Sequence, residues 1–146
     1  MKVLAIDQGT TATKSFTLDE SGRFEPVAAF EHKQIYPHAG WVEHDAEELL
    51  RNVRACLDAA GQVDAIGMDN QGETVIAWDA ATGKPIYNAI VWQDGRTQGI
   101  TEKLKADGAE ELTRARAGLP LDPYFSASKL RWFLDHVGDA RSLLKQ

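Results

Sequence analysis

The chain has 146 residues, 43% of them hydrophobic and 26% charged, a composition typical of a soluble globular protein with its own core. Its net charge of -6 argues against a broad nucleic-acid-binding surface, which would need a basic face. No segment approaches the ~20 apolar residues of a membrane span, and four apolar residues before Asp7 are too few for a signal-peptide core. A cytoplasmic location is expected, and the single cysteine, Cys56, fits a reducing compartment.

The first part of the chain predicts three strands joined by short connections. Residues 2–7 form a near-continuous apolar run, residues 12–18 alternate, and residues 23–34 follow a polar turn. Short connections between strands imply an antiparallel meander. Residues 8–11 then become the turn between the first two strands.

A helix is predicted next, between Asp45 and Gly61. Asp45 with Glu48 three residues later is a start of the capping-box type, and Gly61 ends the pattern. Residues 63–69 predict a strand, and the strand–helix–strand order favours parallel pairing with the central strands. The helix has an apolar stripe at helical spacing, made of Leu49, Leu50, Val53, Cys56, Leu57 and Ala60.

The rest of the chain predicts a hairpin and then helices. Residues 73–78 and 86–92 flank a polar tip and read as the two arms of the hairpin. In the last well-defined helix Ser126 can act as the N-cap. Its expected apolar face is Leu130, Phe133, Leu134 and Val137. The predicted helices are 97–107, 109–116, 126–137 and 140–146.

The segment from Asp7 to Lys14 combines groups that can hold a metal-bound phosphate chain. A carboxylate at a strand end can bind Mg²⁺, and Gly9 lets the backbone turn tightly and approach a ligand. The hydroxyls of Thr10 and Thr11 and successive backbone N–H groups can donate to phosphate oxygens, while Lys14 adds a positive charge. A polar turn at the end of a strand explains the same residues equally well, because short motifs often arise by chance.

The histidines and the cysteine do not predict a metal site. Cys56 lies on the apolar stripe of the predicted helix, which indicates a small buried thiol rather than a nucleophile. Zinc ligands recur at characteristic spacings. No such spacing relates Cys56 to the four histidines, His32, His38, His44 and His136.

Five segments resemble, in order, those of the FGGY family of carbohydrate kinases, and within it those of the glycerol kinases. The last two are long and compositionally unusual, so chance agreement is negligible. The resemblance extends over essentially the whole chain. The segments are DQGTT at 7–11, GWVEHD at 40–45, NQGET at 70–74, NAIVWQD at 88–94 and GLPLDPYFS at 118–126.

The resemblance implies an actin-like, ribonuclease-H-type α/β fold, of which this chain is a partial N-terminal domain. Family members close two such domains around ATP and a polyol. The position of Asp7 helps to hold Mg²⁺, and that of Lys14, often arginine in the family, contacts nucleotide phosphate. Lysine keeps the charge but lacks the bidentate fork of arginine. The phosphate-gripping hairpin corresponds to Gly9, Thr10, Thr11 and Ala12.

For the substrate, the resemblance implies contacts at Glu73, Trp92 and Tyr124. A carboxylate accepts hydrogen bonds from hydroxyl groups with charge assistance. The aromatic rings can pack against the C–H face of a polyol, and Tyr124 also offers its hydroxyl. Without the resemblance, core packing would be the better explanation of both rings. Packing remains the expectation for the other tryptophans, Trp41, Trp78 and Trp132.

Two positions depart from the usual pattern of glycerol kinases. Gly72 replaces an arginine that would donate to substrate hydroxyls, a contact typically worth about 1.5–3 kcal/mol. The vacated space could accept a longer polyol or a ketose. Gly95 also stands where arginine is frequent, and the sequence predicts no consequence of that change.

The function implied is ATP-dependent phosphorylation of a polyol or sugar hydroxyl, with ATP and Mg²⁺ as cofactors. The expected partner is a small-molecule substrate, and no nucleic-acid or membrane partner is expected. The sequence is compatible with a homo-oligomer. The family's catalytic base lies downstream of residues 118–126, so no catalytic residue is assigned here. Because family members are several times longer, residues 1–146 are expected to be one partial domain that is inactive by itself. A non-catalytic actin-like binding fragment is the competing interpretation.

Overall fold

The computed structural model describes residues 1–144 and divides into two compact units. Unit 1 comprises Met1–Gln34 and His44–Gly72. Unit 2 comprises Ile35–Glu43 and the chain from Glu73 onward. Each unit has its own hydrophobic cluster. The prediction of one domain over residues 1–146 also covers two residues, 145 and 146, that lie outside the described part.

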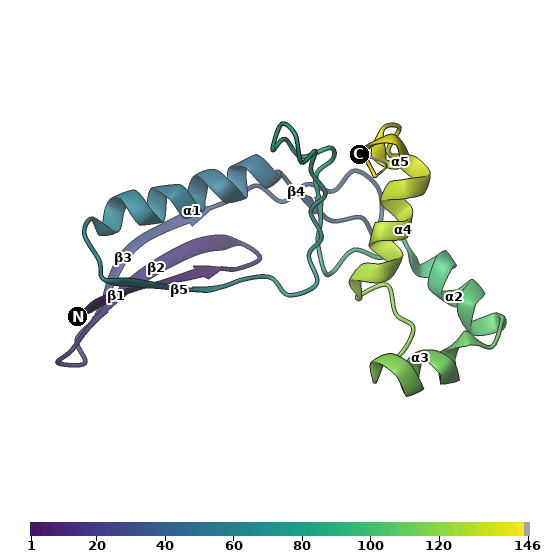
Figure 1. Cartoon of the computed structure of the whole chain (residues 1–146), viewed down its shortest axis with the longest axis horizontal. Helices are drawn as coiled ribbons and strands as arrows, with labels where there is room; N and C mark the ends of the chain where they lie inside the picture. The colour runs from purple at the N-terminus through teal and green to yellow at the C-terminus, as the bar shows by residue number, and fades with distance from the viewer. Residues whose placement is uncertain (145–146) are drawn as a thin grey trace. The chain divides into compact units, whose positions relative to one another are not determined.

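Unit 1 is a four-stranded sheet with helix α1 packed along it (Figure 1). The strand order is β3-β2-β1-β5, with β1 antiparallel to β2, β2 antiparallel to β3, and β1 parallel to β5. This is the predicted meander followed by a strand–helix crossover. The elements are β1 (Lys2–Gln8), β2 (Ala12–Asp19), β3 (Phe24–Glu31), α1 (Ala46–Ala60) and β5 (Ala65–Asp69).

The third strand is shorter than predicted, ending at Glu31 rather than at residue 34. The residues that follow find partners outside the sheet. The Lys33 N–H donates to the Glu48 carboxylate at 3.1 Å, and the side chains of His32 and Gln34 bond to the turn between β1 and β2. The sheet hydrogen bonds therefore stop where these residues begin.

Helix α1 begins and ends where predicted, but its capping box is not closed. The Asp45 side chain accepts the Glu47 N–H at 2.9 Å, and Gly61 ends the helix with a φ of 64°. Glu48 does not return to the N-cap, because its carboxylate accepts the Lys33 N–H instead. That bond ties the start of α1 to the segment after β3.

The core of unit 1 lies between α1 and the sheet. Cys56 is fully buried there as a free thiol, as expected. Leu50 was expected on the buried stripe but is 48% exposed, so that prediction was wrong. The buried members of the cluster are Leu4, Ile6, Cys56 and Ala60.

Unit 2 is mainly helical, with one two-stranded sheet of β4 and β6. Its helices agree with the predicted ranges to within one residue, except that the helix predicted at 140–146 ends at Leu143; residues 145 and 146 of that prediction lie outside the described part. The core is built from Val75, Ile90, Trp132 and Phe133. The elements are β4 (Glu43–His44), β6 (Ala89–Ile90), α2 (Gln98–Ala106), α3 (Ala109–Ala117), α4 (Ser126–His136) and α5 (Ala140–Leu143).

The hairpin predicted from 73–78 and 86–92 is reduced to isolated antiparallel bridges. Val75 pairs with Ile90, and Trp78 pairs with Pro85. A proline has no N–H to donate to a ladder, which limits pairing at that arm. Trp78 is 62% exposed, so the expectation that it packs in a core was wrong.

Helix α4 also differs from its prediction in detail. Phe125 occupies the N-cap position, and Ser126 is the first helical residue. On the expected apolar face Phe133 is buried, but Leu130 is 50% exposed. Trp132 takes the place expected of Leu130, since it is buried and belongs to the core.

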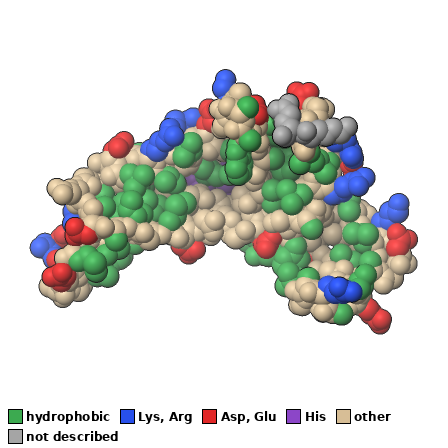
Figure 2. Space-filling view, in the orientation of Figure 1, with side chains coloured by type: hydrophobic (Ala, Val, Ile, Leu, Met, Phe, Trp, Pro, Cys, Tyr) green, Lys and Arg blue, Asp and Glu red, His purple; other side chains and the backbone are tan. Residues whose placement is uncertain are grey.

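Charged side chains of both signs are interspersed with hydrophobic ones on the face that Figure 2 shows. Several large hydrophobic side chains of unit 1 stay exposed, among them Phe24, Ile66 and Met68. Among residues 1–144, no helix is both long and apolar enough to cross a membrane.

Candidate phosphate and polyol sites

The turn between β1 and β2 directs its carbonyl groups toward donors within unit 1. The Gly9 N–H donates to the Ala12 carbonyl at 3.0 Å and closes the turn. The Gly9 carbonyl accepts from the side-chain amides of Gln8 at 3.1 Å and Gln71 at 3.0 Å. Gln71 lies just beyond β5, so the crossover strand brings this donor to the turn.

The next two carbonyls of the turn are held by the segment that follows β3. The Thr10 carbonyl accepts from His32 Nε2 at 2.7 Å and from Gln34 Nε2 at 2.8 Å. The Thr11 carbonyl accepts the backbone N–H of His32 at 3.2 Å. Neither His32 nor Gln34 was a predicted site residue, because no local pattern relates them to a turn about twenty residues earlier.

The orientation of these carbonyls determines where the neighbouring N–H groups point. In a planar trans peptide the C=O and the N–H point in opposite directions. Because the carbonyls of residues 9–11 face donors inside unit 1, the N–H groups of Thr10, Thr11 and Ala12 turn away from those donors. Successive N–H groups turned outward can form an anion-binding nest. Outward N–H groups are what the predicted phosphate-binding turn would use.

Gly9 avoids a tight side-chain contact in this turn. Its φ is not positive, so a left-handed backbone conformation is not the reason for glycine. A Cβ at this position would lie 3.2 Å from the Ala12 carbonyl oxygen and 3.5 Å from the Asp7 carboxylate. A side chain would therefore crowd the Ala12 carbonyl, whereas its distance to the Asp7 carboxylate is that of an ordinary van der Waals contact.

Asp7, Lys14 and Asp69 lie in one row across three neighbouring strands. The register pairs Asp7 with Lys14 on β2 and with Asp69 on β5. Within residues 1–144 no group of three or more His, Cys, Asp or Glu could hold a metal. Mg²⁺ usually takes one or two carboxylates together with water and substrate phosphates. Asp7 and Asp69, two carboxylates in adjacent register, fit that donor set.

Asp69 was not among the predicted site residues. The signal was present, because Asp69 ends a strand predicted to be parallel to the first one. The carboxyl ends of parallel strands meet at one edge of a sheet, where ligands commonly bind in α/β folds. Only the register shows that Asp69 lies directly beside Asp7.

The three predicted polyol-binding residues all lie in unit 2. The rings of Trp92 and Tyr124 meet edge to face, with centroids 5.8 Å apart, and Tyr124 is 42% exposed. Glu73 Oε2 accepts the N–H of Ser126 at 2.8 Å and its hydroxyl at 2.5 Å. Glu73 therefore also holds the start of α4, two residues after Tyr124.

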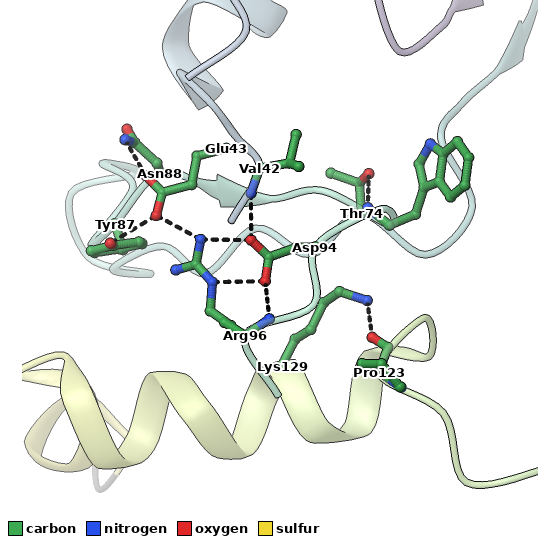
Figure 3. Close-up of polar contacts among 10 residues, drawn as sticks. Val42, Glu43, Thr74, Tyr87, Asn88, Asp94, Arg96, Pro123 and Lys129 are labelled. Atoms are coloured by element: carbon green, nitrogen blue, oxygen red, sulfur yellow. Dashed lines mark hydrogen bonds and ion pairs between the residues drawn. The ribbon is translucent and has the colours of Figure 1, made fainter. Parts of the chain in front are cut away.

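A buried lysine supports the segment that carries Tyr124 (Figure 3). Lys129 Nζ donates to the carbonyl of Pro123 at 2.8 Å and to that of Tyr124. Burial lowers the pKa of Lys129, although nearby carboxylates including Glu73 oppose that shift. The buried amine thus holds the two backbone carbonyls that flank the Cα of Tyr124.

A buried ion cluster follows Trp92 in the chain (Figure 3). Arg96 donates from Nε and Nη2 to Asp94 at 2.9 and 2.8 Å, and from Nη2 to Glu43 at 2.7 Å. Its guanidinium carbon lies 3.9 Å from the ring centroid of Trp41 and 4.6 Å from that of Trp132. Burial alone would lower the pKa of Arg96, but the hydrogen bonds to Asp94 and Glu43 raise it, so the group stays charged.

Each carboxylate of this cluster has further donors. Glu43 accepts from the Tyr87 hydroxyl and the Asn88 amide, both at 2.8 Å. Asp94 accepts the Val42 N–H at 2.6 Å and the backbone N–H of Arg96 at 2.9 Å. The cluster joins segments 40–45 and 88–94 and gives their carboxylates, Glu43 and Asp94, a structural role.

Two histidines that are unrelated in sequence spacing meet in unit 1. The ring centroids of His32 and His44 are 4.6 Å apart, and both rings are buried. Burial, with His32 adding to it, lowers the pKa of His44 to about 4. The two residues are twelve positions apart, so only the fold brings their rings together.

Residues 2–145 match the family described as the FGGY family of carbohydrate kinases, N-terminal domain. The chain belongs to the FGGY family of carbohydrate kinases. It is 49% identical to a glycerol kinase from Saccharopolyspora erythraea, over 96% of this chain and 30% of that protein. It is 51% identical to a glycerol kinase from Beutenbergia cavernae, over 95% of this chain and 29% of that protein. This FGGY chain thus spans about 30% of the length of the curated relatives it matches.

Solved structures agree with this membership. A Plasmodium falciparum glycerol kinase with ADP superposes with a TM-score of 0.87 at 32% identity, covering 99% of this chain and 30% of that one. A xylulose kinase from Rhodospirillum rubrum superposes with a TM-score of 0.83 at 25% identity, covering 98% of this chain and 31% of that one. The predicted actin-like, ribonuclease-H-type fold of an FGGY kinase N-terminal region is confirmed.

Proposed function

We propose that the full-length gene product transfers the terminal phosphate of ATP to a hydroxyl group of a polyol or ketose. The observation that carries the proposal is the β1–β2 turn, whose carbonyls are held inward beside the strand-end carboxylate of Asp7. Family membership supports it, and the P. falciparum relative was solved with ADP.

The residues of unit 1 take the nucleotide part of this proposal. Asp7, with Asp69 beside it, would hold Mg²⁺, which when bound neutralises charge on the phosphates. The outward N–H groups of Thr11 and Ala12 would donate to phosphate oxygens, with Gly9 leaving room for close approach. Lys14 lies opposite Asp7 and adds a positive charge to the same edge.

The residues of unit 2 take the substrate part. Glu73 would accept from a substrate hydroxyl through Oε1, since Oε2 is engaged by Ser126. Trp92 and Tyr124 would pack against the carbon chain and exclude water from it. The group that orients the attacking hydroxyl is not assigned within this chain, and its position downstream stays a prediction.

Glycerol is the first substrate candidate, because relatives at 49% and 51% identity are named glycerol kinase. A longer polyol or ketose is the second candidate. It is favoured by Gly72, where an added Cβ would meet nothing within 4 Å. Open space at the residue before Glu73 is what a longer substrate would require.

A substrate panel on the full-length protein tests both candidates. With Mg²⁺ and ATP, a coupled assay for ADP release should show turnover with glycerol or with polyols and ketoses of four or five carbons. Preference for the longer substrates at least equal to glycerol would support the role of Gly72, and glycerol far ahead would reject it. Turnover with none of them would favour a non-catalytic binding fragment instead.

Asp7→Asn is the matching variant. It should abolish turnover while leaving polyol affinity largely intact, because Asp7 lies in unit 1 and the polyol residues lie in unit 2. Loss of folding in this variant would instead assign Asp7 a structural role. A cytoplasmic location stays a prediction that cell fractionation would test. A homo-oligomer stays a prediction that light scattering would test.

A further inference from the structure

The Thr10 carbonyl, in the central peptide of the β1–β2 turn, accepts hydrogen bonds from side chains outside the hairpin. Two-residue hairpin loops usually adopt type I′ or II′ turns, which need a positive φ. Neither Thr10 nor Thr11 has one. The orientation of the peptide between these two residues is what separates one turn type from another. Negative φ at both residues favours one orientation, and contacts from outside the hairpin add hydrogen bonds that hold it.

Two side chains from beyond the end of β3 supply those contacts. His32 Nε2 and Gln34 Nε2 lie 2.7 and 2.8 Å from the Thr10 carbonyl oxygen. A carbonyl oxygen only accepts, so His32 carries a proton on Nε2. Its Nδ1 is buried and has no hydrogen-bond partner among the residues described.

His44 determines the orientation of the Gln34 amide. His44 Nε2 lies 2.8 Å from Gln34 Oε1 and must donate to it. With its oxygen held in this way, Gln34 presents its NH₂ group to the Thr10 carbonyl. The reversed amide would place two acceptors against each other. His44 is fully buried, and its lowered pKa of about 4 keeps the ring neutral near pH 7.

We propose that His32, Gln34 and His44 are positioning residues that hold the Thr10–Thr11 peptide in the orientation required to bind nucleotide phosphate. The turn is already closed by the Gly9 N–H bond to Ala12, so these contacts are not needed to form the hairpin. Their effect is to point the Thr10 carbonyl inward and hence the Thr11 N–H outward. This inference rests on the proposed function for its ligand, a nucleoside diphosphate or triphosphate with Mg²⁺.

The test compares variants of the full-length protein by calorimetric titration with Mg²⁺·ADP. Gln34→Met removes the donor to Thr10 and the acceptor for His44 at nearly constant length. It should weaken Mg²⁺·ADP about 10-fold, the effect of losing one to two hydrogen bonds, while the KM for the polyol changes less than about twofold. Gln98→Met, at an exposed glutamine that bonds Glu102 on the surface of α2, is the matched control and should leave both values unchanged.

His32 provides an independent pair of variants. His32→Gln keeps an N–H near the position of Nε2 and should retain most of the Mg²⁺·ADP affinity, whereas His32→Leu should lose it to the same degree as Gln34→Met. Equal loss in His32→Gln and His32→Leu would overturn the proposal. So would a parallel loss of polyol and nucleotide binding, or unchanged affinity in Gln34→Met.

Folding and the proposed function are separated by the same measurements. If Gln34→Met does not fold, the His32 pair decides; if none of the three variants folds, the residues maintain the fold and the proposal is overturned. Wild-type protein that binds Mg²⁺·ADP but phosphorylates nothing would refute the proposed function and leave this inference standing. Wild-type protein that does not bind Mg²⁺·ADP would refute both.

Discussion

Arg96→Met should destabilise unit 2 far more than the loss of an ordinary surface ion pair. The guanidinium makes three side-chain hydrogen bonds to two carboxylates, and the side chains of Arg96, Glu43 and Asp94 are 0%, 2% and 0% exposed. Methionine removes the charge and leaves both carboxylates buried. Breaking a buried pair in this way costs about 3–5 kcal/mol.

The remaining contacts place the expected cost within that range. Glu43 keeps two donors, Tyr87 and Asn88, and Asp94 keeps two backbone N–H groups, which favours the lower half. The stacking of Arg96 on Trp41 and Trp132 is lost as well, at about 0.5–2 kcal/mol. We therefore expect the free energy of unfolding to fall by about 4 kcal/mol.

Urea denaturation followed by tryptophan fluorescence is a suitable assay, because Trp41 and Trp132 flank the substituted side chain. The matched control is Arg141→Met. Arg141 also pairs with a carboxylate, Asp135 at 2.5 Å, but its side chain is 60% exposed. Exposed pairs contribute about 0–1 kcal/mol.

The comparison refutes the reasoning if Arg96→Met costs no more than Arg141→Met at an unchanged denaturant m-value. A second check adds Glu43→Gln and Asp94→Asn to Arg96→Met, which removes both stranded charges. The triple variant should recover stability relative to Arg96→Met alone. Further loss would mean that the bonds of the two carboxylates to their remaining donors, and not charge burial, dominate.

Two other predictions concern unit 1. Gly9→Ala should weaken Mg²⁺·ADP binding with little effect on polyol binding, because its Cβ would lie 3.2 Å from the Ala12 carbonyl oxygen; calorimetry that gives wild-type nucleotide affinity would contradict this. Because His44 has a pKa lowered to about 4 in the folded state, stability should be lost as pH falls below the ordinary pKa near 6.5 toward 4. His44 should make the free energy of unfolding up to about 2 kcal/mol lower at pH 5 than at pH 7. This pH dependence of stability should vanish in His44→Gln and persist in the exposed control His38→Gln. Equal pH dependence in the wild type and both variants would exclude His44 as its cause.

Much of unit 1 was predictable from local patterns. Alternation and apolar runs predicted β1, β2 and the crossover to β5, and Asp45 and Gly61 marked the ends of α1 correctly. These features are local, since side-chain periodicity and helix caps depend on residues within a few positions of each other. The same holds for the helices of unit 2, whose bounds agree to within one residue, apart from the one expected at 140–146.

Two of the errors share one physical cause, namely that a tertiary partner replaced a local one. Glu48 bonds Lys33 and so does not close the capping box, and Ser126 bonds Glu73 and so does not act as the N-cap. Leu50 and Leu130 were assigned to buried faces by period alone. Which residues of an apolar stripe are buried depends on the elements packed against the helix. The spacing of apolar residues does not specify those elements.

By itself the sequence determined the family and the segment that carries the phosphate loop, through five blocks of residues and a glycine after a strand-end carboxylate. Only the tertiary structure decided what orients that loop. Asp69 reaches Asp7 through parallel strand register, and Gln71, His32 and Gln34 reach the turn from segments about twenty to sixty residues away. Hydrogen bonds act over about 3 Å, so chain folding, and not sequence spacing, determines which donors meet each carbonyl.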